Sequence, residues 1–503
     1  MNKFFKAMFC VTFFSVCTRA LGFLLKIYLS RKLGSTMLGS YQVTMSIFAV
    51  LLTLVSSGIP VILSRNVSYY SHNNNKKSTG SIVSSGLILT GVICFIVSLF
   101  IICFPDTINI IFSQNISSDM LLILLPALIF SSVYEVLRGA LWGQEQFFAI
   151  SFTEFLEQII RIIFLVLLFE FGIINLSLVN KTALSLSLAC IISAIIVLIV
   201  YIKKGGAFSH PKYEFKNLLK TSTPITAVRT VSSIVAMLIS IIIPIRLQTY
   251  GLTQAEALSE FGIIMGMTFQ LIMIPSTLIS SLAVTMIPSI SGESNDIDKM
   301  SITDRSSLRS KINFSIRTTI VFSTILLPLF IALGKPICEF LYDNSKAGLY
   351  LSYAAIAMLP MGISQITSSI LNAVGLEMKS LKNYAISSTI LILCIFFLPK
   401  YIGTFSLIIG YILMSLVSSL LNLSMLKKRN LVDFNFYKII LIMFGITLIC
   451  SLLGIFTYNL LSKWSIFALF VSAGLVLSST FLLIFTFNIA NFKMVILSKF
   501  HTR

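Results

Sequence analysis

Charged residues inside otherwise apolar segments are the features of this sequence that could do chemistry. Arg19 lies in the first long apolar segment, and Lys26 follows two helical turns later on the same face. A charge at the centre of a membrane-spanning helix costs about 2.5–3.5 kcal/mol, so such residues face a water-filled cavity or pair with one another. Arginine stays charged and binds phosphate oxygens through two parallel hydrogen bonds. The pattern predicts a cationic cavity for an anionic, phosphate-bearing group.

Further cations and one amide accompany later apolar segments. The predicted substrate-binding set is Arg19, Lys26, Arg65, Arg229, Arg246 and Gln270. Small and hydroxylated residues, such as Gly22 and Gly262, recur beside them at helical spacing. Those small residues suit close packing of helices as well as a polar cavity, and both interpretations stay open for each of them.

Acidic residues in the apolar segments form two groups that could pair with arginine. Glu135 and Arg138 lie three residues apart, and Glu154 and Glu157 precede Arg161 by seven and four residues. These spacings allow ion pairs within one helix, which lower the cost of burying each charge. The five residues are candidates either for structural pairing or for a coupling or gating role.

Motifs of soluble enzymes and of metal sites are missing from the sequence. There is no GxxxxGK[ST] loop and no HExxH, the eight cysteines form no CxxC pair, and the three histidines lie in polar segments. We therefore predict a protein that is not an enzyme and that needs no metal, cofactor or nucleic-acid partner.

The elements that must position these charges are long apolar helices. The chain is 56% hydrophobic and only 11% charged, whereas soluble domains carry about 25% charged residues. Apolar runs of roughly 20 residues recur, each long enough to cross a hydrocarbon core of about 30 Å. The pattern predicts an all-α polytopic membrane protein with about fourteen transmembrane helices, at 4–30, 41–66, 81–104, 119–142, 150–172, 182–202, 221–247, 258–290, 313–334, 347–374, 384–399, 404–426, 438–459 and 465–490.

The basic residues orient these spans. With the N-terminus inside, 22 of the 37 lysines and arginines fall in cytoplasmic segments, 7 in external segments and 8 within spans. By the positive-inside rule, this distribution predicts a multi-pass cytoplasmic-membrane protein with both termini in the cytoplasm. The net charge of +19 also favours contact with anionic lipid headgroups.

A lysine-rich segment divides the predicted helices into six and eight. We expect an N-terminal lobe at 1–204, a cytoplasmic linker at 205–220 and a C-terminal lobe at 221–503. A faint internal repeat supports two lobes, because GIPVILS (58–64) and MIPSIS (286–291) close corresponding spans. Two helical halves around a central cavity are a common plan for transporters.

Three segments, TRALGFLLKIYLSRKLG (18–34), LGSYQ (38–42) and SSGIPVILSR (56–65), resemble the polysaccharide-exporter branch of the multidrug/oligosaccharidyl-lipid/polysaccharide flippase superfamily. IPIRLQTYG (243–251) and MIPSIS look like the matching motifs of the second half. The resemblance implies a V-shaped pair of helical bundles that work by alternating access. It also implies a role in cortex peptidoglycan synthesis during sporulation, with the outer forespore membrane as one location.

Lipid II flippases of the same superfamily keep arginines in their cavity, and one of these positions matches the present sequence. Aligned by the motifs above, their first arginine coincides with Arg19. The other positions fall at Leu25 (beside Lys26), near Thr53 and at Gln270. The resemblance thus implies a polyprenyl-diphosphate-linked sugar in general, without indicating lipid II itself.

Three functions are compatible with these observations. The first is an alternating-access flippase for a cell-wall sugar precursor on an undecaprenyl-diphosphate type of lipid. The second is a cation-coupled multidrug antiporter, which needs an acidic residue in its cavity and for which Glu135, Glu154 and Glu157 are candidates. The third is a non-transporting scaffold that binds a cell-wall synthase, and in that case substitutions of the cavity charges should be silent.

Overall fold

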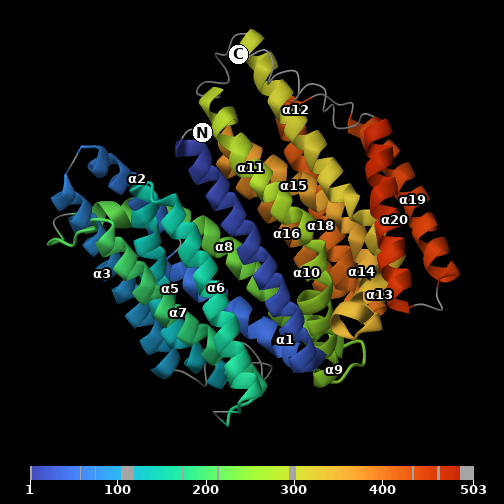
Figure 1. Ribbon diagram of the computed structural model, residues 1–503, viewed down its shortest axis with the longest axis horizontal. Helices are drawn as coiled ribbons and strands as arrows, with labels where there is room; N and C mark the ends of the chain where they lie inside the picture. The colour runs from blue at the N-terminus through green and yellow to red at the C-terminus, as the bar shows by residue number, and fades with distance from the viewer. Residues whose placement is uncertain are drawn as a thin grey trace. The chain divides into compact units, whose positions relative to one another are not determined.

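Helices make up all the regular structure of the described residues, which are 3–56, 58–73, 75–103, 118–172, 175–211, 214–293, 302–432, 436–461 and 465–487 of a computed structural model (Figure 1). Within these ranges, 11 helices are long and apolar enough to cross a membrane, or up to 12 if the bent pair Gln254–Ile272 and Ile274–Ala283 is one span. The expected class, an all-α polytopic membrane protein, is confirmed.

The number of candidate spans falls below the expected fourteen at three places. The first two expected spans are joined into one candidate from Phe13 to Ser71, and the expected span 258–290 is the bent pair Gln254–Ile272 and Ile274–Ala283. The fifth expected span is the helix α6 (Phe147–Glu170), which does not qualify because Glu154, Glu157 and Arg161 lie close together in it. α6 is nevertheless a full-length helix, and its charges are the reason to examine it further.

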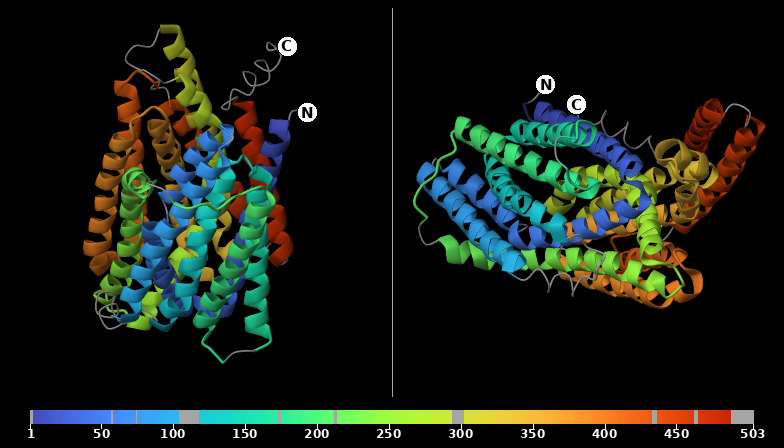
Figure 2. Two further views of the ribbon diagram at one scale, coloured as in Figure 1. Left: turned by 90° about the vertical axis from the view of Figure 1, so that its left-hand side faces the viewer. Right: turned by 90° about the horizontal axis from the view of Figure 1, so that it is seen from below.

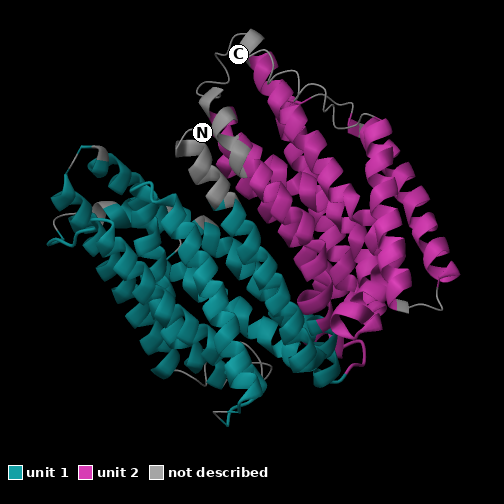
Figure 3. Ribbon diagram, viewed as in Figure 1, with its two compact units in different colours: residues 1–244, 253–262 teal, residues 245–252, 263–503 magenta. Residues whose placement is uncertain are grey.

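The chain folds into two compact units (Figure 3). Unit 1 comprises residues 1–244 and 253–262, and unit 2 comprises 245–252 and 263–503. The division therefore differs from the expected linker at 205–220, because α8 (Glu214–Gln248) belongs to unit 1 as far as Pro244. Close contacts hold it there, since Gly58 lies directly against Ser222 and Thr226.

Unit 1 is built around α5, which packs on several neighbouring helices. Figure 2 shows the helices of the first half of the chain, in blue to green, from two further sides. Its helices are α1 (Lys3–Ser56), α2 (Ile59–His72), α3 (Lys76–Cys103), α5 (Ser118–Gly143), α6, α7 (Leu178–Lys203), most of α8, and α9 (Gln254–Phe261). α1 is interrupted at Gly34, where a left-handed φ of 69° breaks the helix. Glycine adopts that conformation without steric cost.

Glycines on one face of α5 let α2 approach closely. A Cβ on Gly139 would lie 2.7 Å from the carbonyl oxygen of Pro60, and one on Gly143 would lie 2.5 Å from that of Ser64. Two small residues four positions apart on a membrane helix are a common basis of such packing. The contact fixes the start of α2, where Pro60 stands in the first turn.

Unit 2 contains the remaining helices. They are the π-helical stretch η1 (Gly262–Thr268), whose first residue belongs to unit 1, then α10 (Phe269–Ile272), α11 (Ile274–Glu293), α12 (Ile302–Ile325), α13 (Leu327–Tyr342), α14 (Ser345–Ala354), η3 (Ala355–Ala357), α15 (Met358–Ala373), α16 (Glu377–Phe397), α17 (Pro399–Ile402), α18 (Phe405–Lys428), α19 (Phe436–Leu460) and α20 (Ser465–Thr486). A buried polar chain links three of them, because Asn422 donates to Ser368 and Thr367 on α15 and accepts from Asn383 on α16 at 2.9 Å.

We expect Asn422→Leu to lower the free energy of unfolding by about 1–2 kcal/mol, because the fully buried amide joins α15, α16 and α18. Thermal unfolding of the purified chain in detergent measures the change. Ser424→Ala, at an exposed position of the same helix, is the control and should leave stability unchanged. Equal stability of both variants would contradict a structural role for this polar chain.

Candidate functional site

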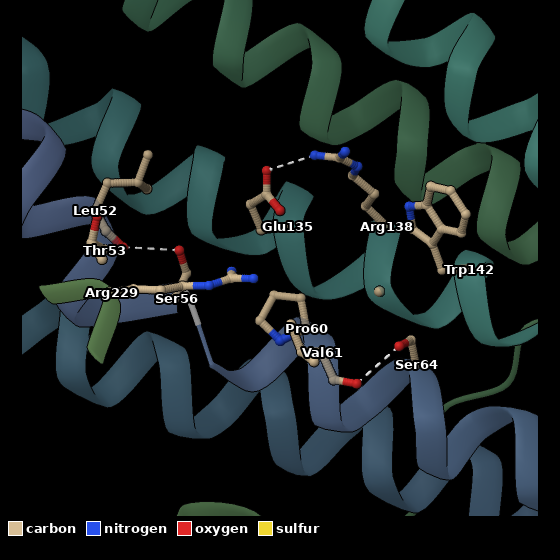
Figure 4. Close-up of a pocket in the computed structure, with 11 residues that line it drawn as sticks. Leu52, Thr53, Ser56, Pro60, Val61, Ser64, Glu135, Arg138, Trp142 and Arg229 are labelled. Atoms are coloured by element: carbon tan, nitrogen blue, oxygen red, sulfur yellow. Dashed lines mark hydrogen bonds and ion pairs between the residues drawn. The ribbon is translucent and has the colours of Figure 1, made fainter. Parts of the chain in front are cut away.

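A cavity of about 410 Å³ opens among four helices of unit 1, α1, α2, α5 and α8 (Figure 4). Pro60 of α2 packs closely against Gly139 of α5, so these two helices are in contact where they line the cavity. Its lining mixes apolar, hydroxylated and charged side chains, and consists of Leu52, Thr53, Ser56, Pro60, Val61, Ser64, Glu135, Arg138, Gly139, Trp142 and Arg229.

Arg138 is the best-anchored cation of the cavity. Its Nη1 lies 3.0 Å from Oε1 of Glu135 on the same helix, and its Nη2 pairs with Oε1 of Glu154 on α6. The three side chains are about one-third exposed, at 31%, 35% and 28%. The predicted pair Glu135–Arg138 is confirmed. Glu154, however, pairs with Arg138 on the neighbouring helix rather than within its own helix.

A second set of contacts ties α6 to α1. Nη2 of Arg161 donates to the hydroxyl of Tyr41 at 3.1 Å, which joins α6 to the second half of α1. Glu157 lies within electrostatic range of both Arg161 and Arg138. Ion pairs thus join α5 to α6 through Arg138, and a separate hydrogen bond joins α6 to α1 through Arg161.

The first half of α1 contributes two more cations near these side chains. Arg19 interacts electrostatically with Glu154, and Lys26 lies close enough to Arg161 for their like charges to interact. Between them, a Cβ on Gly22 would lie 3.6 Å from Nε2 of Gln158 on α6. The face of α1 predicted from spacing therefore points to α6. We call Arg19, Lys26, Glu135, Arg138, Glu154, Glu157 and Arg161 the charge group.

Arg229 brings a further cation to the cavity from α8. Its side chain is exposed and lines the cavity, and Figure 4 shows its guanidinium extending past Ser56. One turn along α8, the Ser233 hydroxyl lies 3.0 Å from that of Thr53 on α1. This contact fixes the face of α8 that carries Arg229, so the cavity holds two guanidinium groups from different helices.

Of the predicted substrate-binding residues, Arg229 lines the described cavity, Arg19 and Lys26 belong to the charge group without lining the cavity, and the other three lie elsewhere. Arg65 is exposed on α2 next to Ser64 and does not line the cavity. Arg246 belongs to unit 2, where its Nε donates to the Phe396 carbonyl at 2.8 Å and its guanidinium lies 4.3 Å from the centre of the Phe396 ring. Gln270, also in unit 2, donates to the Met265 carbonyl at 3.3 Å. A role in substrate binding stays a prediction for all three.

Sequence reasoning missed several members of the site. Trp142 follows Arg138 by one helical turn, so spacing alone could have placed this rare residue on the same face. Tyr41 and Gln158 carried no such signal, because their contacts depend on how α1 packs against α6. Among the described residues, no three histidine, cysteine, aspartate or glutamate side chains form a group that could hold a metal ion.

Comparison with known proteins identifies sequence relatives. The family model described as "Polysaccharide biosynthesis protein" matches residues 4–292. Stage V sporulation protein B of Bacillus subtilis is 21% identical over 404 residues, which cover 77% of the present chain and 76% of that protein. Sporulation protein YkvU of the same organism is 23% identical over 304 residues, 58% of the chain and 66% of the relative. These matches confirm the resemblance seen in the sequence motifs.

Solved structures of similar fold include two types of transporter. Lipid II flippase MurJ, in an inward closed conformation, matches with a TM-score of 0.72 and 17% identity over 95% of this chain and 99% of that one. A multidrug resistance MATE family transporter in an inward-facing conformation matches with a TM-score of 0.68 and 14% identity, over 82% and 94%. The fold is therefore the one that MATE and MurJ transporters share.

Proposed function

Because the chain belongs to the polysaccharide biosynthesis protein family, we propose that it is an alternating-access flippase for a cell-wall sugar precursor linked to a polyprenyl diphosphate. The observation that carries the proposal is the cavity of unit 1 with the guanidinium groups of Arg138 and Arg229. A guanidinium can bind phosphate oxygens through parallel hydrogen bonds, the role proposed for Arg229, whereas Arg138 adds positive charge beside the diphosphate because its Nη1 and Nη2 already pair with Glu135 and Glu154.

The two arginines have different roles in this proposal. Arg229 has an exposed side chain on the cavity wall, so a headgroup that enters the cavity can contact its guanidinium. Arg138 is held between Glu135 and Glu154, which fix the orientation of its guanidinium. The apolar lining residues Leu52 and Val61 provide a surface for the first units of a lipid chain.

The relatives support a role in the envelope of a sporulating cell. The names of the two curated relatives both refer to sporulation, and one structural neighbour is a lipid II flippase. We extend the proposal to a precursor of spore cortex peptidoglycan on an undecaprenyl-diphosphate lipid, handled in the cytoplasmic membrane or the outer forespore membrane, with both termini in the cytoplasm. A cell-wall synthase that polymerises the exported unit would be the natural partner.

Depletion of the protein during sporulation is the direct test of the proposed substrate. We expect a lipid-linked sugar precursor to accumulate on the cytoplasmic side, because synthesis continues while export stops. Mass spectrometry of extracted lipids identifies the accumulated species. An unchanged lipid profile, together with normal cortex formation, would refute the proposal.

We expect Arg19→Ala to abolish flipping and Arg19→Lys to restore it in part, because Arg19 adds positive charge beside Glu154. Flipping of a labelled lipid-linked sugar in proteoliposomes measures the effect. Arg31→Ala, at an exposed position later in the same helix, is the matched control and should flip normally. Wild-type flipping by Arg19→Ala would favour the scaffold function, in which cavity charges are dispensable.

A cation-coupled drug antiporter is the second candidate, and one observation favours it. Glu135 lines the same cavity, and its carboxylate could attract a cationic drug. For that function, Glu135→Gln should abolish drug efflux while Arg229→Ala should spare it. A flippase should show the opposite order for the transport of its lipid, with Arg229→Ala the more damaging change.

A further inference from the structure

A second cavity, of about 220 Å³, lies at one polar end of unit 1 and shares no lining residue with the first. It forms where three connecting segments meet. These are the connection between α2 and α3, the connection between α5 and α6, and the segment that follows α7. Its polar lining includes Asn75, Lys76, Thr79, Gln144, Gln146 and Lys204. Nothing in the proposed transport function uses these residues.

One wall of this cavity is held firmly in place. The segment 205–211 crosses the first turns of α3, where the Ser209 hydroxyl donates to the Lys77 carbonyl at 2.6 Å. The hydroxyl of Ser81 donates in return to the His210 carbonyl at 3.0 Å. These bonds join residues more than 120 positions apart in the sequence. The cavity is therefore a built feature of the fold and not a gap beside a loose loop.

The charged side chains that line this cavity are both lysines. Lys76 stands in the first turn of α3 and Lys204 directly follows α7, and both side chains are exposed. No carboxylate is among the described residues that line it. Asn75 caps α3 by accepting the Ser78 amide at 3.1 Å, and helix geometry leaves the preceding amides without an intrahelical acceptor. Two ammonium groups and a helix N-terminus together favour a phosphate.

Two amide side chains line the cavity, and one of them carries a buried acceptor that lacks a donor among the described residues. Oε1 of Gln144 is buried and has no hydrogen-bond partner in the described part of the chain. Gln146 uses its own Nε2 to donate to the Gln144 backbone carbonyl at 3.4 Å, so it does not satisfy that oxygen. Buried acceptors in native proteins are paired with protein, water or ligand. Gln144 and Gln146 both line the cavity, so their amide side chains offer hydrogen bonds to a hydroxyl group of a bound phosphate ester.

We propose that this cavity binds the glycerophosphate group of an anionic membrane lipid, with its phosphate at Lys76 and Lys204 and a glycerol hydroxyl at Gln144. The polar ends of membrane helices are where lipid headgroups lie, and juxtamembrane lysines attract anionic lipids. A free glycerophosphate in the cytoplasm offers the same chemistry, so the experiment has to separate the two sources.

The test compares two double variants of the full-length protein that lose the same charge. Lys76→Gln/Lys204→Gln removes the cavity lysines, and Lys77→Gln/Lys203→Gln removes their exposed neighbours, which do not line the cavity. Native mass spectrometry in detergent measures bound phosphatidylglycerol and phosphatidylcholine during titration. We expect the wild type and the neighbour variant to prefer phosphatidylglycerol. The cavity variant should lose roughly tenfold in affinity for it, the equivalent of two partly exposed phosphate contacts.

Glycerol 1-phosphate, added as a competitor, identifies the source of the ligand. Displacement of bound phosphatidylglycerol would support a lipid site in this cavity. Binding of glycerol 1-phosphate without preference for phosphatidylglycerol would overturn the lipid as the ligand. Equal weakening by both double variants would show only diffuse attraction to the surface, and an unchanged affinity of the cavity variant would exclude the cavity; either result overturns the proposal.

Discussion

Replacement of Arg138 by alanine is expected to abolish transport and to lower the free energy of unfolding by roughly 2–3 kcal/mol. The guanidinium bridges Glu135 and Glu154, so its loss leaves two carboxylates side by side without compensation. Removing one partner of a buried ion pair costs about 3–5 kcal/mol, and the partial exposure of these side chains reduces that figure. Thermal unfolding and flipping in proteoliposomes measure the two effects.

A triple variant separates the structural role of Arg138 from its role in binding. In Arg138→Ala/Glu135→Gln/Glu154→Gln the carboxylates are replaced by neutral amides, so stability should recover while transport stays absent. Arg138→Lys keeps the positive charge but loses the fork that contacts both carboxylates. We expect it to retain most of the stability and little transport. Full transport by the triple variant would show that Arg138 serves only to balance charge.

Gly39→Ala is expected to prevent normal folding, because the backbones of α1 and α9 are in direct contact at this point. A Cβ on Gly39 would lie well under 3.0 Å from the carbonyl oxygen of Leu258, and one on Gly262 would clash with that of Ser35. Backbone atoms cannot move aside as a flexible side chain can. Overpacking costs about 1–3 kcal/mol where side chains can adjust. A larger cost is expected here, and the yield of folded monomer measures it.

Gly91→Ala on α3 is the matched control for that experiment. Gly91 is exposed, and a Cβ there would meet nothing within 4 Å. Alanine in a helix is about 1 kcal/mol more favourable than glycine, so this variant should be as stable as the wild type or slightly more so. Size-exclusion profiles and melting temperatures in detergent compare the two. Equal yields would contradict the tight contact between α1 and α9.

The membrane class and the positions of the charges could be predicted because both follow from local physics. A charge within an apolar helix is costly, so Arg19, Glu135 and Arg138 were conspicuous in the sequence. Glu135 and Arg138 are about one helical turn apart in the same helix, so their spacing in the sequence is enough to predict the contact. The same spacing placed Arg19 and Lys26 on one face, which the structure directs to α6.

Contacts between helices could not be predicted in this way. The spacing within α6 was compatible with an ion pair between Glu154 and Arg161. In the structure, α5 packs on α6 and Glu154 forms its ion pair with Arg138 instead. Arg161 instead meets Tyr41, which lies 120 residues away in the sequence. A single sequence shows which face of a helix is polar, but it does not show which helix packs against that face. The interaction partners of Glu154 and Arg161 could therefore be identified only from the fold.

Local hydrogen bonds of polar side chains were another feature that spacing did not reveal. In the sequence, Gln270 follows Gly262 and Gly266 at helical spacing, and its role in substrate binding stays a prediction. The Gln270 side-chain amide donates to the carbonyl of Met265, five residues earlier. Met265 lies within the π-helical stretch Gly262–Thr268, and Gln270 follows that stretch. A π-helical turn changes the spacing of backbone acceptors, and nothing in the amino-acid types announces it.

The density of charge in α6 has a consequence for how the protein is made. Glu154, Glu157 and Arg161 make this helix a poor candidate to leave the translocon for lipid by itself, since each charge opposes partitioning by about 2.5–3.5 kcal/mol. Arg138 on the preceding helix offsets the charge of Glu154. During synthesis, α5 should therefore be retained beside the translocon until α6 emerges, so that the two helices enter the bilayer together with Arg138 shared between Glu135 and Glu154.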